Sequence, residues 1–381
     1  MKWEKVKLGE LYEVHNGLSK AGKFFGEGYP FLTFSTVFNN YFIPKQITDL
    51  VQSTEKEQES YSIRRGDVFV TRTSETSDEL GMSCVALKDY PMATYNGFTK
   101  RMRPITNRVF PEYIGYYMRL PSFRGEFRAF STMTTRASLR NEDLLGLEVK
   151  LPSIEIQKQI AGILSVYDDL IENNQKQIKL LEEAAQRLYK EWFVDLHFPG
   201  HENTKIVDGV PEGWSRGLLK ELISVNYGKD HKKAPDDGNI PVYGSGGLMR
   251  KCNKSLYSGE AVLIPRKGSL NNIMYVDETF WTVDTMFYAT MKQPHTAVFV
   301  YFFVKAFDMY SMNIGAAVPS MTAKILDAMD VVIPDKETLE KFDKYAKVYF
   351  NKIKTLQGQN DRLKIVRDLL LPKLMSGEVE V

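Results

Sequence analysis

The chain has 381 residues, of which 43% are hydrophobic and 26% charged, and its formal net charge is +2. This length predicts two or three domains, and the composition excludes a disordered chain. The near-balanced charge alone does not indicate a nucleic-acid partner. Two cysteines exclude a disulfide framework and a multi-cysteine metal site. There is no signal-peptide pattern and no apolar run of about 18 residues, so we expect a soluble, cytoplasmic protein without a membrane segment.

The opening segment of the chain recurs 211 residues later. WEKVKLGELYEVHNG (3–17) and WSRGLLKELISVNYG (214–228) share six identical positions. The middle of each half also repeats, since RRGDVFVTR (64–72) resembles YSGEAVLIPR (257–266). Each of these two segments has a glycine turn, a short apolar strand and a final arginine. The pattern predicts a duplicated domain.

The end of each half completes the repeat. ASLRNEDLLGLEVKLPS (137–153) aligns with PSMTAKILDAMDVVIPD (319–335), with a shift of 182 residues. A period near 200 residues is too long for a solenoid. We therefore expect two domains and two linking elements.

Each linking element carries a long heptad pattern, which is typical of a coiled coil. The first seam consists of Ile160, Leu164, Tyr167, Ile171, Asn174, Ile178, Leu181, Ala185, Leu188 and Trp192. The second consists of Phe342, Ala346, Tyr349, Ile353, Leu356, Asn360, Leu363, Arg367, Leu370 and Leu374. The alternative is a pair of unrelated amphipathic core helices.

The seam asparagines indicate the direction of the helices. In a parallel pair Asn174 and Asn360 would each face an aliphatic side chain, and an unpaired buried amide costs about 1–3 kcal/mol. An antiparallel pair sets Asn174 beside Asn360 and fixes the register. The other pairs expected from this register are Ile171 with Leu363, Ile178 with Leu356, Ile160 with Leu374 and Trp192 with Phe342. The alternative is that both amides face solvent.

The predicted fold class is α+β, with two globular domains separated by a long antiparallel two-helix coiled coil and related by a pseudo-two-fold repeat. We expect globular domains at 1–150 and 198–333 and helical spacers at 151–197 and 334–381. A rigid spacer between two copies of one domain suits a long, two-fold symmetric ligand, and duplex DNA is such a ligand.

The charge distribution agrees with a DNA partner. Residues 64–140 contain 13 Lys and Arg against 7 Asp and Glu, and residues 216–267 contain 10 against 5. The first helix, residues 153–195, has 5 against 8. Basic domains and an acidic spacer fit proteins that neutralise phosphates. Ordinary solvated surfaces would give the same counts.

Several loops combine side chains that contact bases or phosphates. Arginine can bind guanine in a bidentate manner, asparagine can bind adenine in the same way, and tight glycine loops can approach a phosphate. Structural turns would have the same composition, so the pairing of these loops across the repeat is the stronger signal. The candidate DNA-binding residues are Arg72, Thr73, Ser74, Asn96, Lys100, Arg136, Tyr243, Ser245, Lys251, Arg266, Lys267, Ser269, Asn271 and Thr282.

No catalytic motif is present. The chain lacks an amino-methyltransferase tetrapeptide, a dinucleotide fingerprint and a Walker motif, and its five histidines form no ligand cluster. PDDGNIPVYG (235–244) begins like a nuclease motif but lacks the acidic-x-Lys that would follow. We therefore expect no catalytic residue, no metal site and no cofactor in this chain.

The helical segment LPSIEIQKQIAGILSVYDDLIENNQKQIKLLEEAAQRLYKEWFVD strongly resembles the specificity subunit of type I restriction-modification enzymes. RDLLLPKLMSGEVEV is similar to the end of its second helical region, and SGEAVLIPRKGSLNNIMYVDETFWTVDTMF resembles its target recognition domain. The first recognition domain departs from the family's usual Arg-x-Gly-Ser form, because it has Arg72-Thr73-Ser74.

The resemblance implies a bipartite double-stranded DNA target, with each half read by one domain. It also implies two modification subunits, which use S-adenosylmethionine to methylate adenine, and two restriction subunits, which use ATP and Mg²⁺ to translocate and cut DNA. Two other hypotheses stay open: a coiled-coil scaffold that binds no DNA, and a repressor that acts without a modification subunit.

Overall fold

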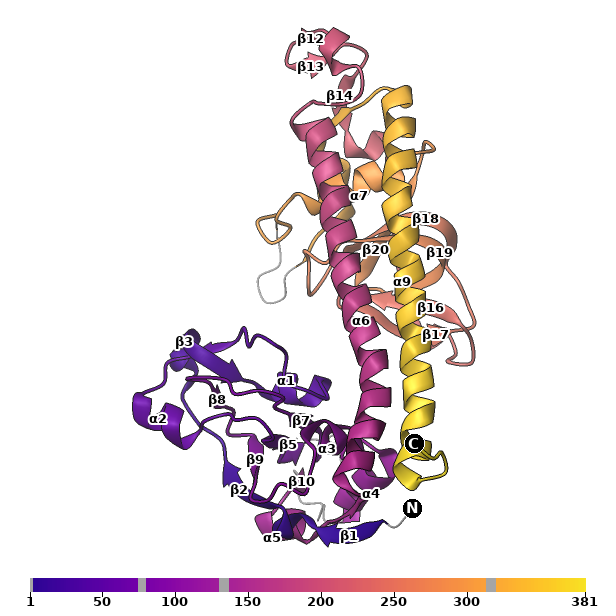
Figure 1. Ribbon diagram of the computed structural model, residues 1–381. Helices are drawn as coiled ribbons and strands as arrows, with labels where there is room; N and C mark the ends of the chain where they lie inside the picture. The colour runs from indigo at the N-terminus through magenta and orange to yellow at the C-terminus, as the bar shows by residue number, and fades with distance from the viewer. Residues whose placement is uncertain (1–2, 75–79, 130–136, 313–319) are drawn as a thin grey trace. The chain divides into compact units, whose positions relative to one another are not determined.

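The computed structural model describes residues 3–74, 80–129, 137–312 and 320–381 (Figure 1). It contains two compact units. Unit 1 comprises Met1–Asn173 and Asn360–Val381, and unit 2 comprises Asn174–Gln359. Each unit combines sheets with short helices and with one half of each long helix, so the predicted α+β class is confirmed.

Unit 1 is built around a four-stranded sheet in the order β2-β9-β5-β7, accompanied by the three-stranded sheet β4-β3-β8 and the strand pairs β1–β11 and β6–β10. Its strands are β1 (Glu4–Lys7), β2 (Tyr12–Asn16), β3 (Phe25–Leu32), β4 (Leu50–Val51), β5 (Val68–Thr71), β6 (Thr73–Ser74), β7 (Ser83–Val85), β8 (Thr94–Tyr95), β9 (Thr99–Pro104), β10 (Ala137–Ser138) and β11 (Glu148–Leu151). Its short helices are α1 (Phe34–Asn39), α2 (Glu55–Ser60), α3 (Pro111–Tyr117), α4 (Pro121–Ala129) and α5 (Asn141–Gly146).

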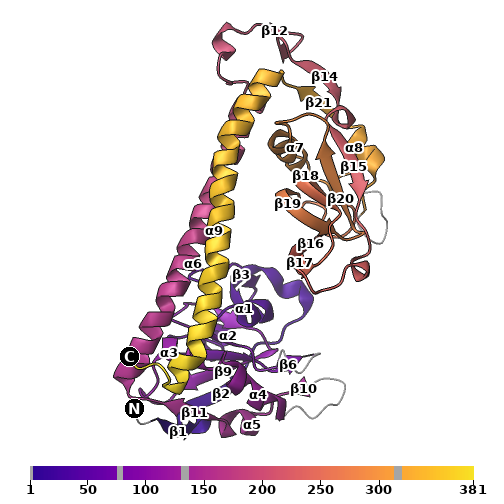
Figure 2. The same cartoon turned by 90° about the vertical axis from the view of Figure 1, so that its right-hand side faces the viewer.

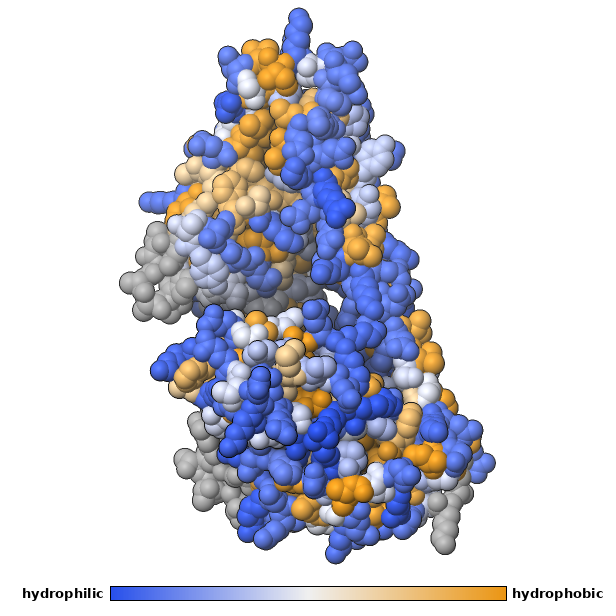
Figure 3. Space-filling view, turned by 60° about the vertical axis from the view of Figure 1, so that its left-hand side comes forward, coloured by the Kyte–Doolittle hydropathy of each residue, from blue (hydrophilic) through white to orange (hydrophobic). Residues whose placement is uncertain are grey.

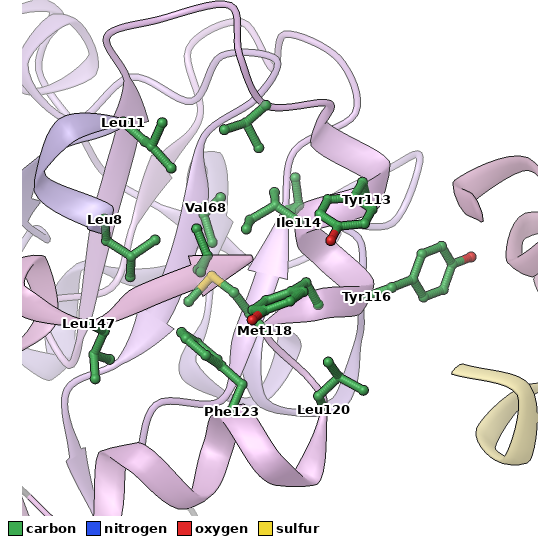
Figure 4. Close-up of a cluster of buried hydrophobic side chains, with 14 of the residues drawn as sticks. Leu8, Leu11, Val68, Tyr113, Ile114, Tyr116, Met118, Leu120, Phe123 and Leu147 are labelled. Atoms are coloured by element: carbon green, nitrogen blue, oxygen red, sulfur yellow. The ribbon is translucent and has the colours of Figure 1, made fainter. Parts of the chain in front are cut away.

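The core of unit 1 lies between this sheet and α3. All four residues of β5 are buried, as expected for a continuous apolar run in a central strand. Leu8, Val68, Ile114 and Phe123 belong to one apolar cluster (Figure 4). These side chains come from distant parts of the chain, so the cluster holds the sheet and α3 together.

Unit 2 has a six-stranded sheet in the order β15-β20-β18-β19-β16-β17, together with the pairs β12–β13 and β14–β21. Its strands are β12 (Ile206–Val207), β13 (Val210–Pro211), β14 (Ser215–Leu218), β15 (Ile223–Tyr227), β16 (Ile240–Gly244), β17 (Gly247–Cys252), β18 (Tyr257–Pro265), β19 (Met274–Thr282), β20 (Met286–Met291) and β21 (Asp330–Ile333). Helix α7 (Ala297–Lys305) packs on β18 and β19, and α8 (Ala323–Asp327) precedes β21.

The two units repeat one topology. In unit 1 β1 pairs antiparallel with β11, and in unit 2 β14 pairs antiparallel with β21. The turn that follows the first strand of each pair bonds to the residues just before the second strand. In unit 1 Leu8 N donates to Leu147 O, and in unit 2 Leu219 N donates to Met329 O, both at 2.8 Å. The internal repeat expected from the sequence is confirmed.

Two long helices, α6 (Ile154–Tyr189) and α9 (Lys336–Ser376), each contribute to both units. In unit 1 Ile160 of α6 and Leu374 of α9 join one apolar cluster. In unit 2 the rings of Trp192, just after α6, and Phe342 lie 5.8 Å apart. Figures 1 and 2 show the two helices running in opposite directions. The antiparallel direction is confirmed in each unit, and the alternative of two unrelated core helices is wrong.

Both seam asparagines are buried: Asn174 is 8% exposed and Asn360 5%. The alternative in which both amides face solvent is therefore wrong. Asn174 belongs to unit 2 and Asn360 to unit 1, and their pairing stays a prediction.

Within the described ranges of the chain, no helix is both long enough and apolar enough to cross a bilayer.

Candidate nucleic-acid interface

Each unit places an arginine just after a central strand of its sheet. In unit 1 Arg72 follows β5, and its N–H donates to the Phe98 carbonyl at 3.0 Å. In unit 2 Arg266 follows β18, and its N–H donates to the Thr285 carbonyl at 2.9 Å. The sequence predicted that these two arginines are counterparts, and the two backbone contacts agree with that prediction.

In unit 2 the guanidinium of Arg266 rests on aromatic rings. Its Cζ lies 5.4 Å from the Tyr227 ring centroid and 5.7 Å from that of Phe287. Nη1 donates to the Asp284 carbonyl at 3.2 Å. These contacts hold the guanidinium in one place on a partly exposed surface.

The loop after Arg266 carries Lys267 and Ser269, both exposed. Both polar atoms of the Asn271 side chain are hydrogen-bonded: Nδ2 donates to Asp308 Oδ1 at 2.9 Å, and Oδ1 accepts from Met309 N at 2.8 Å. Asn271 therefore ties its loop to the segment at residues 308–309, and it would have to exchange these bonds to bind adenine.

A second loop of unit 2 lies beside the first. Asn272 Nδ2 donates to the Ser245 carbonyl at 2.9 Å, which joins the glycine-rich loop at 243–247 to the arginine loop at 264–272. Tyr243 donates its hydroxyl proton to Glu278 at 2.5 Å. Burial first, and then this bond and the carboxylate charge, raise the pKa of Tyr243. Lys251 on β17 is exposed.

Thr282 differs from the other candidates of unit 2. It is 0% exposed, and its hydroxyl has no hydrogen-bond partner among the described residues. A side chain inside the core offers DNA no surface, so the prediction that Thr282 contacts DNA does not fit this position and we leave it out of the interface.

In unit 1 Lys100 is a buried cation close to Arg72. It is 5% exposed, and its ammonium donates to Asn141 Oδ1. Burial first, and then the positive charge of Arg72, lower the pKa of Lys100. Lys100 therefore contributes to the electrostatics of the loop more than to a surface that DNA could touch.

The remaining candidates of unit 1 are turn and strand residues. Asn96 Oδ1 accepts from Phe98 N at 2.7 Å and shapes the turn before β9. Thr73 and Ser74 form β6, which pairs with β10. Arg136 lies outside the described residues.

Both copies of the repeat match a known protein family. The family model described as the type I restriction modification DNA specificity domain matches residues 1–183 and 211–364, which is most of the chain and one match for each copy of the repeat. The chain belongs to the DNA specificity subunits of type I restriction-modification systems.

Known specificity subunits resemble this chain over its whole length. The type I restriction enzyme MjaIX specificity subunit of Methanocaldococcus jannaschii is 25% identical, covering 100% of this chain and 94% of the relative. The HindI specificity subunit of Haemophilus influenzae is 22% identical, with 99% of each chain covered. The crystal structure of the S subunit from M. genitalium shares the fold, with a TM-score of 0.56 and 17% identity over 98% of this chain and 96% of that one.

In this specificity subunit, Tyr227 and Tyr310 lie beside the arginine loop but are not among the DNA-binding residues predicted from the sequence. Tyr227 is 55% exposed under Arg266, and Tyr310 is 45% exposed, with its hydroxyl bonded to the Gly268 carbonyl at 3.2 Å. Tyr227 stands just before Gly228, at the end of the repeated opening segment, and this position could have identified it.

The helices of the specificity subunit carry a second apolar stripe, whose members each directly precede a seam residue. In unit 1 it comprises Ile163, Val166 and Leu170 of α6 and Val366 and Leu369 of α9, all at least 38% exposed. In unit 2 it comprises Leu180 of α6 and Tyr345 and Val348 of α9, all at least 56% exposed. In an antiparallel pair, positions preceding the seam on both helices lie on the same side, so each unit has one apolar helix face.

Unit 2 also has an apolar groove of about 430 Å³ between α6 and α7. Its apolar lining consists of Tyr189, Val194, Phe302 and Ala306, and its polar and charged lining of Glu183, Gln186, Arg187, Lys190 and Lys305. The space-filling view shows apolar side chains gathered on this unit (Figure 3). Among the described residues no group of three His, Cys, Asp or Glu side chains is arranged to hold a metal ion.

Proposed function

We propose that this specificity subunit recognises a bipartite double-stranded DNA target, one half with each unit, and directs adenine methylation and ATP-dependent cleavage by partner subunits. The repeated arginine loop carries this proposal. Arg72 and Arg266 follow equivalent strands in two units of one chain. The side chains beside the two arginines differ, so the two units are suited to different half-sites.

We propose recognition domains at residues 1–150 and 198–333, and helical spacers at 151–197 and 334–381. The heptad seams support a stiff spacer, because a coiled coil resists bending better than a single helix does. A fixed spacer would leave a constant number of unread base pairs between the half-sites. Pairing of Asn174 with Asn360 would fix that register.

The charge of the loops supports contact with phosphates. The segment that carries Arg72 has 13 basic against 7 acidic residues, and the one that carries Arg266 has 10 against 5. Exposed lysines such as Lys251 and Lys267 add non-specific attraction, while the arginines contribute sequence preference.

The chain contributes no catalysis in this proposal. Methylation requires adenine to leave the base stack, so a subunit that holds the DNA assists a partner that carries S-adenosylmethionine. Cleavage would use the ATP and Mg²⁺ of restriction subunits. The same DNA partner places the complex in the cytoplasm.

The apolar helix faces support two modification subunits. One face lies in unit 1, around Val366 and Leu369, and another in unit 2, around Tyr345 and Val348. Exposed apolar stripes at heptad spacing are the surface that another amphipathic helix covers. Two such faces fit two copies of one partner. The proposed pair of restriction subunits rests on family membership alone.

The experiment measures binding and methylation together. The subunit, with the chains that co-purify with it, is titrated with random-sequence duplex at rising salt, and methylated adenines are mapped in the host with and without its gene. We expect salt-sensitive binding and a bipartite methylated sequence that disappears with the gene. No DNA binding would favour a scaffold, and specific binding without a methyltransferase partner would favour a repressor.

A further inference from the structure

The strands beside the two arginines occupy matched registers. In unit 1 Lys100 of β9 lies between Asn16 of β2 and Val70 of β5. In unit 2 Phe287 of β20 lies between Tyr227 of β15 and Ile264 of β18. The arginine follows two residues after Val70 or Ile264 in each unit. Asn16 and Lys100 therefore correspond to Tyr227 and Phe287.

The aromatic pair in unit 2 forms a platform for Arg266. The two rings lie 5.1 Å apart at 78°, with Phe287 fully buried and Tyr227 exposed. The backbone of Arg266 is held on both sides, because its carbonyl also accepts from Met321 N at 2.9 Å. Stacking on an aromatic surface limits the rotation of a guanidinium.

The guanidinium of Arg266 has no carboxylate partner in the described part of unit 2. Its one side-chain hydrogen bond there goes from Nη1 to a backbone carbonyl. The undescribed residues of this unit, NIGAAVP (313–319), contain no acidic side chain. Arg266 is thus a fixed cation whose charge is not neutralised by its own unit.

We propose that Tyr227 is a positioning residue that holds Arg266 ready to read a guanine in the half-site of unit 2. This proposal rests on the proposed function. A guanidinium fork matches guanine O6 and N7, and a fixed fork loses less side-chain freedom on binding. Among the described residues of unit 1 no such platform lies under Arg72, since Asn16 and Lys100 occupy the matched places.

The experiment selects bound duplexes from a pool randomised in both half-sites, using the full chain with its co-purified partners. Arg266→Ala should reduce the preference for one G·C pair of one half-site by about ten- to a hundredfold. Tyr227→Ala should reduce the same preference by a smaller factor, and Tyr227→Phe should restore it. Because Tyr227 is exposed, we expect Tyr227→Ala to fold, which its melting temperature checks.

Two controls are built in. Arg216→Ala removes an exposed arginine of unit 2 that bonds the Asp208 carbonyl, and it should leave the selected sequence unchanged. The half-site of unit 1 should keep its sequence in every variant. If Tyr227→Ala keeps the parent's preference, or if Arg266→Ala weakens all sequences equally with a shallower salt dependence, the inference is wrong. If the parent itself selects no sequence, the proposed function fails first.

Discussion

Arg367 of α9 forms an ion pair with Asp168 of α6 inside the helix seam of unit 1. The Tyr116 hydroxyl donates to the other oxygen of Asp168 at 2.5 Å, and the guanidinium lies 4.7 Å from the Tyr41 ring centroid. A charged residue at a seam position is therefore answered by a carboxylate on the facing helix. The same carboxylate ties α3 to the helix pair.

Loss of this ion pair should destabilise the protein. Arg367 is 11% and Asp168 26% exposed, so Arg367→Ala leaves a largely buried carboxylate and should lower the free energy of unfolding by about 3 kcal/mol, the low end for buried pairs. Lys45→Ala is the control, because Lys45 and Glu172 are 79% and 41% exposed and should contribute under about 1 kcal/mol. Urea unfolding measures both, and equal losses would contradict the role of the seam pair.

The seam asparagines should favour specificity over stability. Replacing Asn174 and Asn360 together by leucine should keep or raise the melting temperature, since apolar side chains suit the seam, while loosening the register. Size-exclusion chromatography with light scattering measures the species formed, and methylation of targets with altered spacers measures the register. A double variant as monodisperse and as selective as the parent would contradict the hypothesis that the asparagines fix the register.

Asp335 should make unit 2 sensitive to acid. It precedes α9, and its carboxylate accepts from Thr338 N at 2.9 Å and from Trp214 Nε1 at 2.9 Å. Burial alone would raise the pKa of Asp335, but the bonds from Thr338 and Trp214 lower it below its ordinary value. Because the folded-state pKa is depressed, its contribution is present above about pH 4 and lost as pH falls through the folded value.

We expect Asp335→Ala to cost about 1–2 kcal/mol at neutral pH, as for a lost helix cap, and to flatten the fall in melting temperature between pH 5 and about 3. Asp330→Asn, at the exposed first position of β21, is the control and should leave that fall unchanged. Melting followed by circular dichroism across this pH range measures both. A full acid dependence in Asp335→Ala would mean that other groups cause it.

The apolar helix face of unit 1 should bind a partner. Leu369→Glu places a charge on a side chain that is 64% exposed, so folding should be unaffected while co-purification with the modification subunit falls at least tenfold. Met92→Glu changes a similarly exposed apolar residue that belongs to neither α6 nor α9 and should have no effect. Equal recovery of the partner with Leu369→Glu and with the parent would exclude this face.

Exposed lysines near the loops should account for part of the salt dependence. If Lys251 contacts one phosphate, Lys251→Ala should reduce the slope of log K against log salt by about 0.9 without changing the selected sequence. Lys292→Ala removes an exposed lysine just after the end of β20 that is opposite to Thr285, and it should leave the slope unchanged. An unchanged slope in Lys251→Ala would place Lys251 outside the interface.

The sequence by itself determined the duplication, the α+β class and the antiparallel helices. These follow from local patterns: the repeated Trp-to-Gly segment reports the duplication, and a heptad seam with one asparagine in each helix allows few pairings. The sequence also located the matched arginines, because each ends a short apolar strand after a glycine turn.

Only the tertiary structure decided what the side chains around those arginines do. Neighbours distant in the chain bury Thr282 and hydrogen-bond both polar atoms of the Asn271 side chain. They also provide the aromatic rings of Tyr227 and Phe287 on which Arg266 stacks. The ion pair between Asp168 and Arg367 likewise joins residues 199 positions apart. Heptads and strands are local patterns of residues that are close in the sequence, so the sequence alone reveals them. The environment of a side chain depends on residues distant in the sequence, whose contacts exist only in the folded chain.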